Sequence, residues 1–347
     1  MRIFFEKTSL RRSIRAAALG LGALALLAPG GAQAECAGVS MLPQLAQERP
    51  ADLAAARAAA ARIPNSEGLF WRIEAPGRAP SWLLGTFHAP ASEGVTPPGA
   101  ALAALDRAER LLVEISAEEQ AAMQAAIASD PTLIVDMSGG TLDDLLPDSA
   151  RRALDAALRG YGADYESMRR LKPWFVQLMI AVPPCALAAM QAGEPVMDDA
   201  LTARAEAAGT PVQGMESWRQ SLSFFTGMTR QEAADGLLAA IAFADRAEDL
   251  RATMVELYRA ERIYMFWELS RLVTAELVGA AESDQMHEEM WEKVVVDRNL
   301  DFRDAALPAL RRGGAFIAVG ALHLPGRRGM VELLRAEGMT VTRAPLN

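Results

Sequence analysis

The chain has 347 residues, with 44 acidic and 35 basic side chains and a formal net charge of −9 at pH 7. This acidic balance argues against binding to nucleic acid or to anionic membrane surfaces, because both favour clusters of basic side chains. The length suits one large domain or two modest ones.

The first 34 residues have the pattern of a secretory signal peptide. Five basic side chains precede an apolar run over residues 16–27, and the small-x-small sequence Ala32-Gln33-Ala34 follows it. The run is too short to span a bilayer, and no later run reaches about 18 uninterrupted apolar residues. We therefore expect a periplasmic or secreted protein, cleaved after Ala34 and without a stable membrane anchor. Arg11-Arg12 leaves both Sec and twin-arginine export open.

Cleavage after Ala34 would leave 313 residues and lower the net charge to −13, since the leader carries five basic side chains and one acidic. Two cysteines, Cys36 and Cys185, remain in this mature chain. Export leads to an oxidising compartment, where an even number of cysteines permits a disulfide. Two free thiols are the alternative.

The N-terminal arm, residues 35–67, is rich in alanine and leads into a hairpin. Because alanine favours helix, we expect a short helix over residues 51–62. Residues 69–74 and 81–87 are predicted to be the two strands of the hairpin, joined by a turn. The second strand ends in Gly85-Thr86-Phe87-His88.

A helix over residues 97–110 and a buried strand over 111–115 follow, and the strand carries Glu114. Strand, helix and strand form a βαβ unit, which places His88 and Glu114 at the same edge of a parallel sheet. A carboxylate within an apolar run is costly unless it is paired or binds a cation. Glu114 therefore either pairs with an arginine or belongs to a cation site.

The middle of the chain is mainly helical in its pattern. Helices are predicted over 117–128, 144–160, 165–181 and from Asp198 to Gly209. Residues 211–215 form a short strand that ends at Glu216. On the residues alone, a surface or helix-capping role for Glu216 is as open as a functional one.

A capping box at Thr229 opens a long helical region that ends near residue 293. The aromatic cluster at residues 264–267 within this region is typical of a core. His287 does not belong to a His-Glu-x-x-His motif, because Trp291 stands at the last position, and we interpret it as a solvated helix residue.

The sequence pattern around His88, an apolar run followed by Gly-x-x-His, occurs again near the other end of the chain. Arg298 and Asn299 precede a predicted helix over 302–311, and the next strand ends in Gly320-Ala321-Leu322-His323. Two of the three histidines thus follow an apolar strand in a Gly-x-x-His motif. Loops beyond the carboxyl ends of parallel strands line ligand crevices, so the two histidines are expected to converge on one site. The alternative is two loop histidines bonded to backbone.

These motifs resemble the TraB/GumN family, which also includes the Tiki proteases. The resemblance spans about residues 68–343 and rests on the segments 83–88, 112–114, 198–201, 214–217, 298–299 and 319–326. It implies an α/β domain over 68–347, related to erythromycin-esterase and ChaN-like proteins. The expected fold is a central, mostly parallel sheet with flanking helices, and with helical insertions at about 117–195 and 229–295.

The resemblance also implies a divalent-metal site with His88, Glu114 and His323 as ligands. Further motif positions that accompany this site are Glu216, Arg298, Gly85, Gly320, Asp198 and Asn299. Two imidazoles and a carboxylate suit zinc, manganese or cobalt, and they leave coordination positions for water and substrate. Tiki proteins are described as metal-dependent peptidases, whereas bacterial relatives are linked to polysaccharide production and pheromone shutdown.

Our first hypothesis is therefore a periplasmic metal-dependent hydrolase with peptidase-like activity, which acts on a peptide or another small envelope substrate. Glu216 is its candidate general base, and Arg298 either steadies an oxyanion or pairs with Glu114. The alternatives are a non-enzymatic envelope protein that binds haem, metal or peptide, with His88 or His323 as an axial haem ligand, and an accessory protein of polysaccharide assembly. The metal, the substrate and the oligomeric state stay open at this stage.

Overall fold

The computed structural model describes residues 36–346, apart from the side chains at 277 and 278. The predicted leader and its cleavage site lie outside the described residues. One six-stranded sheet has the order β4-β3-β5-β2-β1-β6. Its strands are β1 (Phe70–Glu74), β2 (Ser81–Thr86), β3 (Arg110–Val113), β4 (Val212–Gly214), β5 (Ala315–Gly320) and β6 (Thr340–Arg343).

Four neighbouring strands of this sheet, β4, β3, β5 and β2, run parallel. The hairpin strand β1 is antiparallel to β2, and β6 is antiparallel to β1. Helix α3 (Gly99–Leu105) connects β2 to β3, and β5 lies between these two strands. The predicted α/β fold with a mostly parallel sheet is confirmed. The carboxyl ends of all four parallel strands therefore face one edge.

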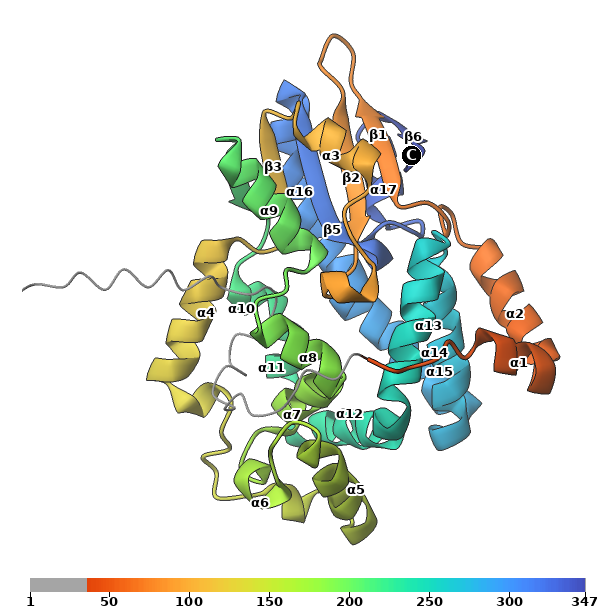
Figure 1. Ribbon diagram of the computed structural model, residues 1–347, viewed down its shortest axis with the longest axis vertical. Helices are drawn as coiled ribbons and strands as arrows, with labels where there is room; N and C mark the ends of the chain where they lie inside the picture. Colours follow the sequence, from red (N-terminus) through yellow and green to blue (C-terminus); the bar gives the residue numbers. More distant parts are fainter. Residues whose placement is uncertain (1–35, 347) are drawn as a thin grey trace, which may run out of the picture.

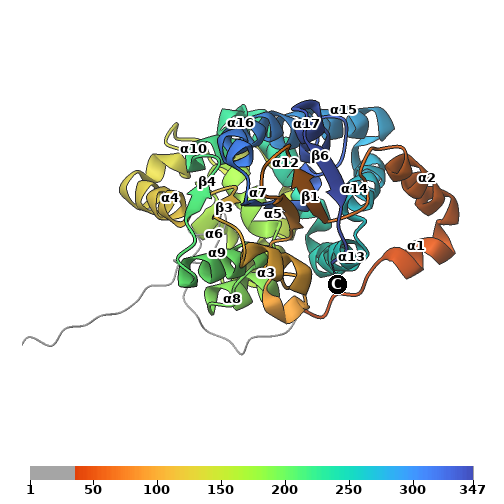
Figure 2. The same cartoon turned by 90° about the horizontal axis from the view of Figure 1, so that it is seen from above.

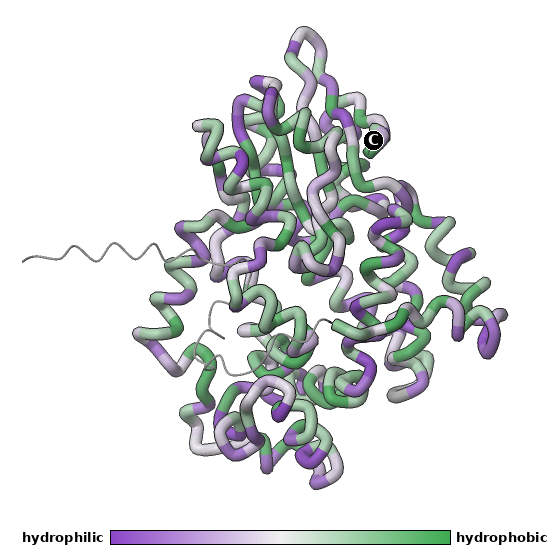
Figure 3. Tube along the Cα trace, in the orientation of Figure 1, coloured by the Kyte–Doolittle hydropathy of each residue, from purple (hydrophilic) through white to green (hydrophobic). Residues whose placement is uncertain are grey.

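Helices cover both faces of the sheet (Figure 2). Leu84 faces α3 and α9 (Met197–Ala207), whereas Leu83 faces α16 (Asp297–Arg312) and α17 (Met330–Ala336). Consecutive side chains point to opposite faces of a strand, so both must be apolar when both faces are covered. This explains the unbroken apolar runs that end at the two motif glycines, and the green colour of the central strands in Figure 3.

The helical part lies beyond the carboxyl edge of the sheet, in the lower half of Figure 1. Its first segment contains α4 (Ala117–Ser129), α5 (Asp148–Arg159), α6 (Tyr165–Met168), α7 (Pro173–Ile180) and α8 (Pro184–Gln191). Its second contains α10 (Trp218–Ser221), α11 (Ser223–Gly227), α12 (Arg230–Phe243), α13 (Ala247–Arg259), α14 (Ile263–Val278) and α15 (Ala280–Met290). The two segments share a core in which Leu154, Val176 and Leu237 are fully buried.

In the described part of the chain, no single helix has the length and hydropathy needed to cross a membrane. Helices α7 and α8 meet that criterion only when taken together, and the chain bends by 87° between them. Pro173 explains why α6 and α7 are separate, although we predicted one helix over residues 165–181. Lys172 precedes Pro173 and is extended, because a following proline disfavours helical backbone.

The N-terminal arm packs against the second helical segment. It contains α1 (Leu42–Glu48) and α2 (Pro50–Ala61), whose apolar side chains pack on α14. Cys36 forms a disulfide with Cys185 of α8, with their α-carbons 5.3 Å apart. The arm is thereby joined covalently to the first helical segment as well.

The segment before the second motif differs from its prediction. Arg298 and Asn299 lie in the first turns of α16, and do not precede the helix. The helix continues directly from a π-helical turn, Trp291–Val296, which follows α15. π-helical turns are frequent at functional sites, and this one leads directly into Arg298 and Asn299.

Candidate active site

Four strand ends bring predicted site residues to the carboxyl edge of the sheet. His88 follows β2, Glu114 follows β3, Glu216 follows β4 and His323 follows β5. Nε2 of His323 lies 3.8 Å from Oε1 of Glu114. Glu114, Glu216 and His323 are each 5% exposed, so two carboxyl groups and an imidazole are buried together. Such a cluster requires compensating charge.

Arg298 of α16 supplies that charge. Its Nη2 atom donates to Oε2 of Glu114 and to Oε1 of Glu216, at 2.6 Å each, and its Nε donates to Oε2 of Glu216 at 3.1 Å. Its Nη1 lies 3.3 Å from Nε2 of His323. One guanidinium thus contacts two carboxylates and one imidazole. Burial lowers the pKa of Arg298, but the two carboxylates outweigh this effect and raise it, so Arg298 stays charged.

The two motif glycines are required by space. A β-carbon at Gly85 would lie 2.6 Å from Cδ1 of Leu324 and 3.0 Å from the α-carbon of Ala321, both in the loop of the second motif. A β-carbon at Gly320 would lie 3.2 Å from Oε1 of Glu114. The amide of Gly320 donates to this same oxygen at 2.5 Å. Each glycine therefore lets two parts of the site approach each other closely.

The carboxylate of Glu114 is held in its ionised form. Burial raises the pKa of Glu114, but Arg298, the nearby imidazoles and the Gly320 amide outweigh this and lower it to about 2. Glu216 shows the opposite balance. Its pKa is raised, because burial and the negative charge of Glu114 outweigh its bonds to Arg298. The two carboxylates of the site are therefore suited to different roles.

His323 is fixed in one orientation and one tautomer. Its Nδ1 lies 2.8 Å from Oδ1 of Asn299, and the amide nitrogen of Asn299 donates to the carbonyl of Arg328 at 2.9 Å. Because Oδ1 can only accept, Nδ1 of His323 carries the proton and Nε2 keeps its lone pair. Burial and, to a lesser extent, Arg298 lower the pKa of His323 to about 4 against the pull of Glu114. The ring is therefore neutral at pH 7.

His88 is anchored in a similar way. Its Nδ1 lies 2.8 Å from Oδ2 of Asp198, and neither atom has a hydrogen-bond partner elsewhere in the described chain. The hydroxyl of Thr86 donates to the other oxygen of Asp198 at 2.9 Å. Burial lowers the pKa of His88, but Asp198 and Glu114 outweigh it and raise the pKa. The His88 side chain is 34% exposed, which makes it the most accessible member of the cluster.

A second arginine holds the loop of the first motif, and nothing in the sequence marked it. Arg251 of α13 donates to the carbonyl of His88 at 2.7 Å, pairs with Glu93 at 2.8 Å, and lies over the ring of Phe87. Both charged side chains are nearly buried. An arginine within an amphipathic helix has no distinctive pattern, so only the structure reveals this contact.

His88, Glu114 and His323 have the donor atoms that suit a divalent metal, although the guanidinium of Arg298 contacts two of them. In residues 36–346, no three His, Cys, Asp or Glu side chains are arranged closely enough to hold a metal ion. The chemistry of the donors is nevertheless suitable. Both imidazoles are held through Nδ1 by an outer residue, as metal-ligating histidines usually are, and the ionised carboxylate of Glu114 lies beside His323.

The third histidine lies elsewhere and is not solvated, so our interpretation of it was wrong. His287 is 8% exposed, its Nδ1 lies 2.9 Å from the carbonyl of Ser283, and its Nε2 lies 3.2 Å from the hydroxyl of Ser270. Its ring packs edge-on against Trp267. The aromatic cluster therefore buries this helix face. His287 takes no part in the site.

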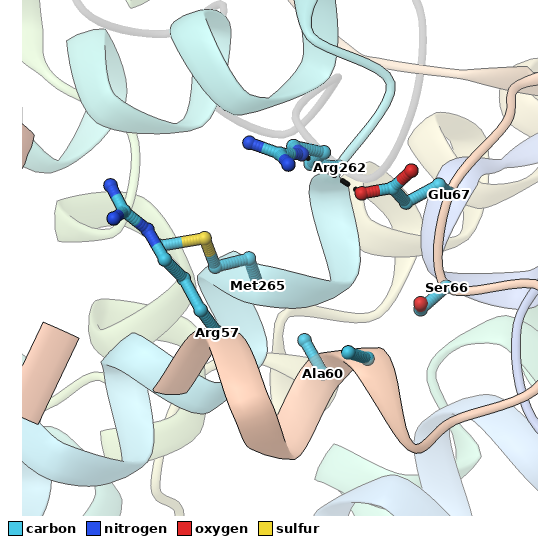
Figure 4. Close-up of a pocket in the computed structure, with 7 residues that line it drawn as sticks. Arg57, Ala60, Ser66, Glu67, Arg262 and Met265 are labelled. Atoms are coloured by element: carbon cyan, nitrogen blue, oxygen red, sulfur yellow. Dashed lines mark hydrogen bonds and ion pairs between the residues drawn. The ribbon is translucent and has the colours of Figure 1, made fainter. Parts of the chain in front are cut away.

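A separate pocket of about 210 Å³ lies between α2 and the start of α14 (Figure 4). Arg57, Met265 and the ion pair of Glu67 with Arg262 line it. Both members of this pair are 52% exposed. The pocket is thus an open surface feature of the N-terminal arm and contains none of the predicted site residues.

Comparison with protein families matches residues 69–343 to the TraB/PrgY/gumN family. No curated protein and no solved structure matches the chain. The match covers nearly the same span as the resemblance drawn from the two Gly-x-x-His motifs, which confirms that assignment. It extends from β1 to β6 and includes every residue of the cluster.

Proposed function

Because the chain belongs to the TraB/PrgY/gumN family, we propose that its strand-end cluster is the active site of an exported, metal-dependent hydrolase with peptidase-like activity. One observation carries the proposal. Both motif histidines have Nδ1 held by an outer side chain, Asp198 for His88 and Asn299 for His323. This arrangement leaves Nε2 as the ligating atom of each ring.

His88, Glu114 and His323 would hold the metal, and zinc, manganese or cobalt suits two imidazoles and a carboxylate. A bound metal of this kind would supply Lewis acidity and lower the pKa of a bound water. Asp198 and Asn299 fix the two rings, and the Gly320 amide fixes Glu114. The burial of Glu114 and His323 excludes bulk water from that side of the site.

Two further residues act on protons and charge. Glu216 is the general base of the proposal, because its raised pKa makes its carboxylate a better proton acceptor than an ordinary glutamate. Arg298 is permanently charged and presents several N–H donors, so it would stabilise a developing oxyanion. The substrate would enter beside His88, the most exposed member of the cluster.

Haem binding by a non-enzymatic envelope protein has less support. An axial ligand needs an accessible Nε2, whereas His323 is 5% exposed and its Nε2 contacts Arg298, which leaves only the partly exposed His88 for this role. The visible spectrum of the purified protein separates these functions, since a bound haem absorbs strongly there.

The proposal predicts hydrolysis that depends on a metal. Protein recovered after export is expected to cleave members of a mixed peptide library, to lose this activity when treated with a chelator, and to regain it with Mn²⁺, Zn²⁺ or Co²⁺. Glu216→Gln is expected to lower kcat by about 10²–10⁴, because it removes the general base. Cleavage that persists in chelator, or that is unchanged in the Glu216→Gln variant, would contradict the proposal.

A further inference from the structure

We propose that Arg298 sets the affinity and the preference of this site for metals, because its guanidinium competes with a metal for the same ligand atoms. The inference rests on the proposed function and adds that Arg298 controls which metals bind at the proposed site. It follows from the atoms that Arg298 contacts and from the number of lone pairs that these atoms have.

The contact with His323 decides the point. Asn299 accepts the Nδ1 proton of His323, so the ring has one lone pair in its plane, on Nε2. Nη1 of Arg298 lies 3.3 Å from that nitrogen. A metal and the guanidinium cannot both use one lone pair. Metal binding through His323 therefore requires Arg298 to release it.

The carboxylate contacts extend the competition. Arg298 bonds to Glu114 and to Glu216 at 2.6 Å each, so its single positive charge is shared between the two carboxylates. A metal that binds Glu114 replaces positive charge that Arg298 already supplies. Its binding free energy is therefore less favourable than it would be at a carboxylate without a partner. Arg298 thus lowers the affinity for every cation at this position.

The competition also discriminates between metals. Mg²⁺ and Ca²⁺ bind mainly to oxygen, so most of their binding free energy would come from the carboxylate that Arg298 already pairs with. Manganese, cobalt and zinc also obtain binding free energy from the imidazole nitrogens. The guanidinium therefore excludes the oxygen-seeking cations more strongly than the transition metals.

Arg298 also has a second acceptor close by. Its Nη1 lies 3.5 Å from the carbonyl of Val294, in the π-helical turn directly before α16. Its side chain is 17% exposed, so it is not completely enclosed. A displaced guanidinium can keep Glu216 and this carbonyl as partners while it leaves Glu114 and His323.

The test compares metal binding with and without the guanidinium. Arg298→Met alone leaves two buried carboxylates unpaired, so the variant is made on Glu216→Gln, and Glu216→Gln alone is the matched control. Each chelator-treated protein is titrated calorimetrically with MnCl₂ and MgCl₂. We expect the double variant to bind Mn²⁺ at least tenfold more tightly than the control, and to gain measurable binding of Mg²⁺.

The outcomes separate this inference from the proposed function. If Arg298 instead orients the metal ligands, its loss weakens Mn²⁺ binding, and equal or weaker binding by the double variant overturns the inference alone. If neither the wild type nor any variant binds Mn²⁺, the proposed metal site fails and the inference fails with it. Arg298→Lys on the same background keeps the positive charge without the planar guanidinium. We expect it to increase the affinity for Mn²⁺ less than Arg298→Met does.

Discussion

Replacing Arg298 with methionine is expected to lower the free energy of unfolding of the metal-free protein by about 3–5 kcal/mol, since it leaves buried carboxylates without their charged partner. Glu114 and Glu216 are each 5% exposed, and each accepts a bond of 2.6 Å from this guanidinium. Without it, two carboxylates would stay buried side by side. Urea unfolding in the presence of a chelator measures the difference.

Two further variants control this prediction. Arg311→Met removes an exposed arginine from the same helix and is expected to change stability by less than about 1 kcal/mol. Adding Glu216→Gln to Arg298→Met is expected to recover part of the loss, because one buried charge remains in place of two. A loss below about 1 kcal/mol for Arg298→Met would show that the carboxylates do not depend on it.

Acidification is expected to destabilise the metal-free protein in two overlapping ranges. The pKa of His323 is lowered to about 4, so its contribution is complete above the ordinary value of 6.5 and is lost as pH falls from 6.5 to 4. The pKa of Glu114 is lowered from 4.5 to about 2, so its contribution is lost between pH 4.5 and 2. Each shift corresponds to about 3 kcal/mol.

Two groups in the site act in the opposite direction. The raised pKa values of His88 and Glu216 favour the folded state at low pH, and their contributions are lost as pH rises. The test therefore compares the wild type with Glu114→Gln across the pH range. The variant is expected to show a weaker dependence between pH 4.5 and 2, and the part that remains comes from other carboxyl groups with lowered pKa values, such as Asp143. Parallel curves for the two proteins would contradict the assignment of that range to Glu114.

The central sheet and the positions of its strand-end residues could be predicted from the sequence, because local patterns encode them. A strand covered on both faces must be apolar at consecutive positions, as Leu83 and Leu84 are. A parallel sheet then fixes the edge on which Glu114 and His323 must lie. The glycines that end the two apolar runs are visible in the sequence as breaks in the pattern, although the contacts that require them come from distant parts of the chain.

The arrangement inside the site could not be predicted in this way. The pairing of Arg298 with Glu114 was one of two roles that we expected, but the two residues are 184 positions apart and no local pattern states that this arginine also contacts Glu216 and His323. The same holds for Arg251, whose contact with His88 spans 163 positions. His287 was misjudged because a polar helix face gave no sign of the aromatic side chains that cover it.

Metal content tests the central claim most directly. Elemental analysis of purified wild-type protein, of the His88→Ala, His323→Ala double variant and of His287→Gln compares the two motif histidines with the one outside the site. We expect about one transition-metal ion per chain in the wild type and in His287→Gln, since three protein ligands hold one ion in sites of this kind. The double variant is expected to contain none. Equal metal content in the wild type and the double variant, or none in either after growth with added manganese and zinc, would contradict the assignment of these residues as metal ligands.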